Sequence, residues 1–381
     1  MKPGTLLGVM ESARDELARL RQNRSGWQEL RYDEAVGADG YAYDTAMARR
    51  AKVLWALQYD RRADDHDLLR HIAEQEAVCR RKAPLAGLSD EARLAGFLLA
   101  EHGEIEDVWT QWAIKRANFD TTTGYDVEHL LAAGVAATIE YVRASDHEDK
   151  DALLKQVLDR RGEPIVTEDE LAAWFERKSR QFPTDPDAED PMTWVERARL
   201  VGDVDAARDY LARWADGRAR DQSTLSQLRY HQSAVGDYAA AAQTQEEYLS
   251  LLGTPRDLAV NWCTLAEFRR RAGQYEAALA ALRQCGRVIV DVPNWEQYAM
   301  GRTYVKELVL LALAADVQLA SAVFAEADGV ASAVPRLPAT MLAATAEAAE
   351  RTGHHLRAEH YRERLAEEQR QAGSETDRSR G

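Results

Sequence analysis

The segment from Asn118 to Asp126, NFDTTTGYD, carries a cluster of side-chain oxygens that could do chemistry. Asp120, Asp126 and the threonine hydroxyls between them are potential ligands for a cation or for a polar molecule. An EF-hand calcium loop needs more acidic residues and a closing glutamate, and both are missing here. The same residue types also form turns and helix N-caps, with Gly124 in the turn. Both interpretations stay open, and we favour the structural one.

Histidines occur in three suggestive groupings: His71 with Glu74, His129 with Asp126, and the trio His354, His355 and His360. The sequence lacks four familiar catalytic or binding motifs: paired Glu-x-x-His, His-Glu-x-x-His, Gly-x-Ser-x-Gly and the glycine-rich phosphate loop. Each histidine is therefore predicted to be a surface or capping residue. We expect no enzyme activity, no cofactor and no metal, with a helical enzyme of unrecognised site as a distant alternative.

The three cysteines, Cys79, Cys263 and Cys285, are an odd number without metal-ligand spacing. This usage fits a reducing compartment and small buried side chains. Cys263 has arginines nearby in the sequence and could be a reactive thiol, but we favour a buried role. No run approaches the roughly 18 apolar residues of a membrane span, and the charges within Met1 to Leu20 are unlike a signal peptide. We expect a cytoplasmic protein that does not enter a membrane.

The formal net charge of −15 argues against nucleic acid as a partner, because phosphate binding needs clustered Lys and Arg. The charge is uneven, since residues 101–150 hold 11 Asp and Glu against 4 Lys and Arg. This acidic segment could attract a basic partner, but we favour a solvated face.

The first half of the chain has the pattern of separate amphipathic helices. They are predicted over residues 5–21, 43–59, 66–81, 89–101 and 168–181, the last opened by a capping box of Thr167 and Glu170. Between them, Trp109 and Trp112 belong to an apolar stripe at helical spacing. Tandem tryptophans could form a ligand platform, but the spacing favours a core role.

Three of the ten prolines, Pro183, Pro186 and Pro191, fall in one short Asp-rich segment. Such a segment interrupts helices and predicts a domain boundary. We expect an N-terminal helical domain over residues 1–182, a linker over 183–191, a second domain over 192–371 and a disordered tail over 372–381.

Trp262 to Cys285 reads as two helices that cross closely. Ala266 and Ala278 supply the small pair that a close crossing needs, and Gly273 ends the first helix because it lacks a Cβ. Tyr275 and Leu282 then fill the space beside the small pair. One such hairpin leaves an apolar face uncovered, so it predicts neighbouring hairpins.

The same offsets recur along the second half, with turns at Gly202, Gly236, Ala315 and Gly353. Units begin near residues 188, 222, 259, 301 and 339. This pattern resembles the tetratricopeptide repeat (TPR) family, whose period of about 34 residues the first spacing matches and the others exceed. The resemblance implies an all-α solenoid of helix hairpins, which the N-terminal half could continue as degenerate repeats. Together with the composition, it predicts more than two thirds helix and essentially no strand.

The resemblance also implies a protein- or peptide-binding scaffold or adaptor with a groove lined by the first helix of each unit. The groove candidates are Arg199, Tyr230, Glu267, Arg270 and Arg271, and the secondary candidates are Trp109, Asp120 and Asp126. Arg270 and Arg271 are adjacent, and either could meet an acidic ligand or be solvated. The alternative function is a ligand-responsive bacterial regulator with a peptide-sensing TPR domain, although no basic recognition helix is visible.

Overall fold

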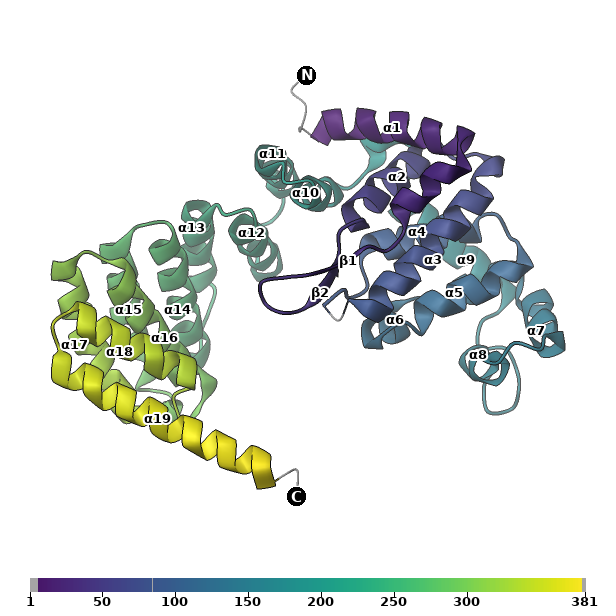
Figure 1. Ribbon diagram of the computed structural model, residues 1–381. Helices are drawn as coiled ribbons and strands as arrows, with labels where there is room; N and C mark the ends of the chain where they lie inside the picture. Colours follow the sequence, from purple (N-terminus) through teal and green to yellow (C-terminus); the bar gives the residue numbers. More distant parts are fainter. Residues whose placement is uncertain (1–5, 84, 379–381) are drawn as a thin grey trace. The chain divides into compact units, whose positions relative to one another are not determined.

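The computed structural model describes residues 6–83 and 85–378. Of these residues, 74% are helical, which confirms the predicted all-α fold (Figure 1). The chain divides into two compact units, Met1–Tyr210 and Leu211–Gly381, and each unit is described by itself.

The first unit is a helical domain with one small β-hairpin. In chain order its elements are α1 (Leu6–Gln22), η1 (Arg24–Leu30), β1 (Glu34–Val36), β2 (Ala42–Asp44), α2 (Met47–Tyr59), η2 (Ala63–Asp65), α3 (His66–Lys82), α4 (Asp90–Ala100), η3 (Ile105–Asp107), α5 (Val108–Lys115), α6 (Phe119–Gly124), η4 (Val127–Leu131), α7 (Val135–Ala144), α8 (Lys150–Val157), α9 (Glu168–Gln181), η5 (Pro186–Ala188), α10 (Pro191–Leu200) and the start of α11 (Val204–Ala215). Here η denotes a 3-10 helix. The capping box at Thr167 is present as predicted.

The β-hairpin replaces a segment for which the sequence predicts only loop and the start of a helix. β1 and β2 are antiparallel, with Ala35 opposite Tyr43. Helix α2 therefore begins at Met47 rather than at Tyr43. The carboxylate of Asp44 accounts for the difference, because it accepts hydrogen bonds from the backbone of Asp33 and Ala46, both at 3.0 Å.

A chain of buried ion pairs joins this hairpin to the helices behind it. The fully buried guanidinium of Arg50 donates to Asp44 at 2.5 Å and to Glu76 at 2.8 Å. Arg80 donates to the other oxygen of Glu76 at 2.9 Å and to Ser89, the N-cap of α4, at 2.6 Å. A buried guanidinium needs a carboxylate to offset its lost hydration. These four charged side chains therefore fix β2, α2, α3 and α4 to one another.

The proline-rich segment over residues 183–191 packs within the first unit rather than behaving as a free linker. The amide of Gln58 donates to the Pro183 carbonyl at 2.9 Å and to the buried Glu189 at 2.8 Å. The Tyr59 hydroxyl donates to Glu189 at 2.6 Å, and Arg197 on α10 donates to Gln58 at 2.6 Å. The division between the two units falls later, within α11, because these contacts hold α10 to the first unit.

The second unit continues from α11 as paired antiparallel helices. Its elements are α12 (Gln222–Ala234), α13 (Tyr238–Leu249), α14 (Pro255–Arg271), α15 (Tyr275–Ile289), η6 (Trp295–Gln297), α16 (Ala299–Ala314), α17 (Val317–Ala333), α18 (Ala339–Arg351) and α19 (His355–Arg378). Each even-numbered helix packs on the next one, and Figure 1 shows the hairpins side by side. Helix α19 runs to Arg378, so it includes most of the predicted tail.

The turns and the close crossing follow the predicted register. Gly236, Gly273 and Gly353 all have positive φ angles, between 74° and 77°, in the left-handed region where glycine is favoured. The turn between α16 and α17 differs from these three. The backbone of Ala315 is extended there, and the side chain of Asp316 caps α17. Ala266 and Ala278 are 1% and 0% exposed, as a small pair at a close crossing should be.

We name α12, α14, α16 and α18 the first helices of the hairpins and α13, α15, α17 and α19 the second helices. First helix α14 packs on α16, and α16 packs on α18. Contacts between successive second helices are weaker. The first helices α14, α16 and α18 therefore lie next to one another along one side of the second unit.

Substituting Ala278 with Leu should destabilise the second unit by about 1–3 kcal/mol, because the larger side chain overpacks the close crossing of α14 and α15. The matched control is Ala280→Leu on the same helix, where the position is exposed and a change below about 0.5 kcal/mol is expected. Urea denaturation of both variants measures the difference. Equal urea midpoints for the two variants would show that the crossing is not closely packed at Ala278.

Candidate functional site

The exposed side of the first helices carries a row of side chains that can meet a partner. On α14, Val260, Thr264, Glu267 and Arg271 recur at helical spacing, so they share one face. We define the first-helix face by these four and by the corresponding exposed residues of α12, α16 and α18: Tyr230, Thr303, Lys306 and Glu347. Tyr230 and Val260 are 61% and 43% exposed, so this face offers an aromatic and an aliphatic side chain to solvent.

Two of the predicted groove arginines have internal partners of different strength. Arg270 donates to the carboxylate of Glu307 on α16 at 3.0 Å and 3.2 Å, and the two side chains are only 14% and 2% exposed. Arg271 pairs with Glu267 at 2.9 Å but is 46% exposed. An exposed pair is worth less than about 1 kcal/mol, whereas separating a buried pair costs several. Arg271 can therefore exchange its partner for a ligand, and Arg270 serves to join α14 to α16.

Arg271 also connects neighbouring hairpins. Its guanidinium donates to the hydroxyl of Tyr238 at 2.9 Å, and Tyr238 begins the second helix of the preceding hairpin. Arg351, which likewise lies two residues before a turn glycine, donates to the carbonyls of Ala312 and Ala315 in the preceding hairpin. The part-buried contacts of Arg351 thus help to fix the stacking of successive hairpins, whereas the contact of Arg271 with Tyr238 is exposed.

The remaining groove candidates lie in different units. Tyr230 and Glu267 belong to the first-helix face of the second unit, and the Tyr230 ring makes an edge contact with His231 at 5.0 Å. Arg199 lies on α10 of the first unit, where it pairs with Glu196 at 2.7 Å. The sequence-predicted groove is thus divided between two units by the packing of α10.

The oxygen-rich segment from Asn118 to Asp126 forms a capped helix. Asn118 caps α6 and exchanges hydrogen bonds with Thr121. The hydroxyls of Thr122 and Thr123 donate to backbone carbonyls of the preceding turn. Asp120 is exposed beside Gly87, whereas Asp126 has partners on α9. Among the described residues, no group of three His, Cys, Asp or Glu side chains is placed to hold a metal ion.

Trp109 is half-buried, and its ring stacks on the imidazole of His147 with 3.7 Å between centroids and 6° between planes. Trp112, from the same helix, is 7% exposed. One face of Trp109 is thus covered by the chain itself.

A buried polar cluster surrounds His129, which the sequence pairs only with Asp126. His129 is 1% exposed, so the predicted surface or capping role is wrong for this histidine. We name Tyr125, Asp126, His129, Trp174 and Lys178 the His129 cluster. The His129 ring stacks on Tyr125 at 4.1 Å and contacts the Trp174 edge at 4.6 Å. Asp126 accepts from Trp174 Nε1 and from Lys178 Nζ, both at 2.9 Å. Trp174 and Lys178 are one helical turn apart on α9, so this cluster attaches α9 to η4.

The pKa values of His129 and Asp126 in this cluster shift for different reasons. Burial lowers the pKa of His129 to about 3, and this outweighs the attraction of Asp126, which acts in the opposite direction. Burial tends to raise the pKa of Asp126, but the hydrogen bonds from Lys178 and Trp174 hold it below its usual range. At neutral pH the cluster therefore holds a neutral imidazole beside the carboxylate of Asp126.

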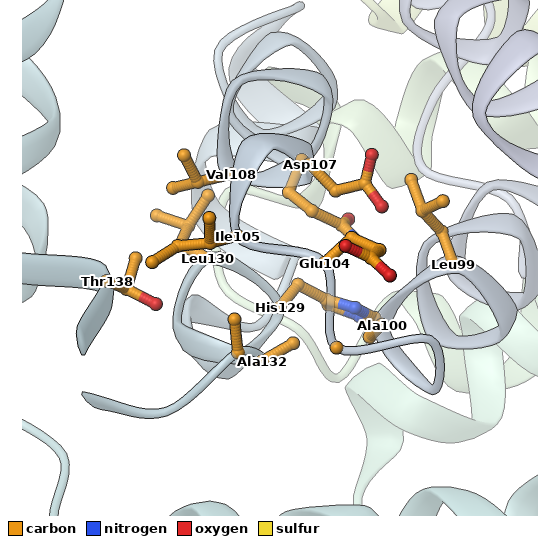
Figure 2. A pocket seen from close by; sticks show the side chains of 13 residues that line it. Leu99, Ala100, Glu104, Ile105, Asp107, Val108, His129, Leu130, Ala132 and Thr138 are labelled. Atoms are coloured by element: carbon orange, nitrogen blue, oxygen red, sulfur yellow. The ribbon is translucent and has the colours of Figure 1, made fainter. Parts of the chain in front are cut away.

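A small cavity adjoins this imidazole. Figure 2 shows His129, Glu104, Asp107 and Thr138 on its wall. The centre of a water molecule can occupy about 10 Å³ of the cavity, which is room for roughly one water. Asp107 is already held by His66 and Arg70, both at 2.6 Å. The cavity is thus too small for an organic substrate, and we interpret the His129 cluster as structural.

Sequence reasoning did not find Glu307 or the His129 contacts with α9. Glu307 is an acidic residue within the largely apolar helix α16, and an acid in such a helix is a signal that it has a buried partner. The partner itself, Arg270, is 37 residues away and has no local signature.

Comparisons with known proteins leave the chain without an assigned family. No family model matches it, and no curated protein matches it. A solved structure described as the crystal structure of MamA protein is similar over 48% of this chain and 92% of its own, with 16% sequence identity and a TM-score of 0.31. At that TM-score, function has to be inferred from the geometry of the chain itself.

Replacing Arg270 with Ala should lower the free energy of unfolding by about 3 kcal/mol, because it leaves the carboxylate of Glu307 buried without its guanidinium. Replacing the exposed Arg271 with Ala should cost less than about 1 kcal/mol. Denaturant unfolding of both variants measures the contrast. The double variant Arg270→Ala with Glu307→Ala should recover part of the loss, and additive losses would show that the two residues are not coupled.

The free energy of unfolding of the His129→Phe variant should depend on pH differently from that of the wild type. In the folded protein His129 binds a proton only near pH 3, whereas in the unfolded chain it does so near pH 6.5. Between these pH values the unfolded wild type therefore binds more protons than the folded wild type. Acidification below pH 6.5 should therefore destabilise the wild type relative to the variant by roughly 1.4 kcal/mol per pH unit. Above about pH 7.5 the difference should be constant. Parallel stability curves down to pH 4.5 would contradict the buried neutral imidazole.

Proposed function

We propose that the protein is a non-catalytic helical-repeat scaffold that binds a protein or peptide segment along the first-helix face of its second unit. The observation that carries this proposal is the exposure of a mixed row of side chains on the first helices, of which α14, α16 and α18 pack directly on one another. Aromatic, aliphatic, cationic and acidic groups are represented by Tyr230, Val260, Lys306 and Glu267. The resemblance to TPR proteins supports the same assignment.

The scaffold presents these side chains without rearrangement. The buried Arg270–Glu307 pair and the small pair at Ala266 and Ala278 hold α14 against α16 and α15. Preorganised side chains lose less conformational entropy on binding than side chains on a mobile loop. The charged members of the face, such as Arg271 with Glu267, are exposed pairs that can reorganise at small cost.

The binding face is tested by site-specific photo-crosslinking in the full-length protein. Benzoylphenylalanine is placed at Tyr230 or Thr264 on first helices, or at the exposed control positions Ala280 and Ala325 on second helices. We expect crosslinks to a discrete partner from the first-helix positions only, and competition by unmodified protein. Equal crosslinking from Ala280 and Ala325, or none from the first helices, would exclude this face as the binding surface.

A further inference from the structure

A preformed pocket in the first unit is lined by residues of the β-hairpin and by Cys79, Ala83, Leu85 and Ala86. Its volume is about 510 Å³, which suits a small organic molecule. Its lining includes Tyr41 and Tyr43 of the hairpin together with Ala83 and Leu85. The two tyrosines are 51% and 50% exposed and Leu85 is 68% exposed, so the pocket opens to solvent through large apolar groups.

The wall behind the pocket is rigid. Cys79 and Asp44 line it, and Asp44 is the first carboxylate of the buried chain through Arg50, Glu76 and Arg80. That chain anchors the base of the hairpin, so the pocket does not need a ligand to form. Burial raises the pKa of the Cys79 thiol to about 11, and this wall therefore contributes a neutral, polarisable group at neutral pH.

The charge of the lining favours a cation. Asp39 and Asp44 are its charged members among the described residues, and no Lys or Arg belongs to it. Asp44 is neutralised by Arg50, but Asp39 is exposed, and its Oδ1 accepts a hydrogen bond from the Tyr41 backbone N–H at 3.1 Å. A carboxylate attracts an ammonium group through charge, and tyrosine rings bind one through their faces, so a lining that holds Asp39, Tyr41 and Tyr43 suits a cation.

We infer that this pocket binds a small organic cation, an amine or quaternary ammonium with an aliphatic or aromatic body. The apolar walls take the body, the tyrosine rings and Asp39 take the cationic head, and the net charge of −15 raises the local concentration of cations. This site lies in the first unit and is independent of the first-helix face.

The probe for the test is octylammonium. It is compared with octanoate, which has the same chain length and a negative head, and with octanol, which has a neutral head. Methyl-labelled methionine NMR of the full-length protein reports binding through Met47, which lines the pocket and is assigned from Met47→Leu. We expect octylammonium to shift the Met47 methyl signal and to bind at least about fivefold more tightly than octanoate. The inference would be overturned if no probe shifted the Met47 methyl signal, or if octanoate bound as tightly as octylammonium.

Two variants locate the cationic head and the body. Asp39→Asn should weaken octylammonium several-fold and leave octanol unchanged, whereas Asp64→Asn, an exposed acid outside the lining, should change neither. Ala38→Trp fills the pocket from the hairpin turn and should abolish the shifts from all three probes, with folding checked by circular dichroism. Unchanged octylammonium affinity in Asp39→Asn would overturn the assignment of the head to Asp39, even if Ala38→Trp failed to fold.

Discussion

Both units depend on the same physical constraint, which is that a guanidinium removed from water needs a carboxylate beside it. In the first unit Arg50 lies between Asp44 and Glu76 and joins the hairpin to two helices. In the second unit Arg270 pairs with Glu307 and joins two first helices. Each pair connects elements that are distant in the sequence. Losing one partner therefore leaves a buried charge, and the elements that it positions lose their register.

This constraint decides which residues remain available for binding. Arg270 and Arg271 are equivalent in the sequence, but one belongs to a buried pair and the other to an exposed one. Only the exposed residue can contact a ligand at small cost. In the first unit, the neutralisation of Asp44 by Arg50 leaves Asp39 as the carboxylate that can attract a cation into the hairpin pocket.

The second unit shows how a repeat tolerates local variation. Three turns use glycine at positive φ, whereas the turn at Ala315 is extended and relies on the Asp316 cap. The hairpin still forms because the apolar faces of α16 and α17 pack on their neighbours regardless of the turn type. Stacking is a property of the helix faces, and the turn only has to reverse the chain.

Local and periodic features were determined by the sequence alone: the all-α fold, the glycine turns, the Thr167 capping box and the small pair at Ala266 and Ala278. These follow from spacings of a few residues, which backbone geometry and helix periodicity constrain directly. Only the tertiary structure decided the partners of Arg270 and Asp44, the burial of His129, the hairpin pocket and the packing of residues 183–191. Those features depend on groups that meet across tens of residues, and the energy of a charge is set by how much water and which counter-charge the fold leaves beside it.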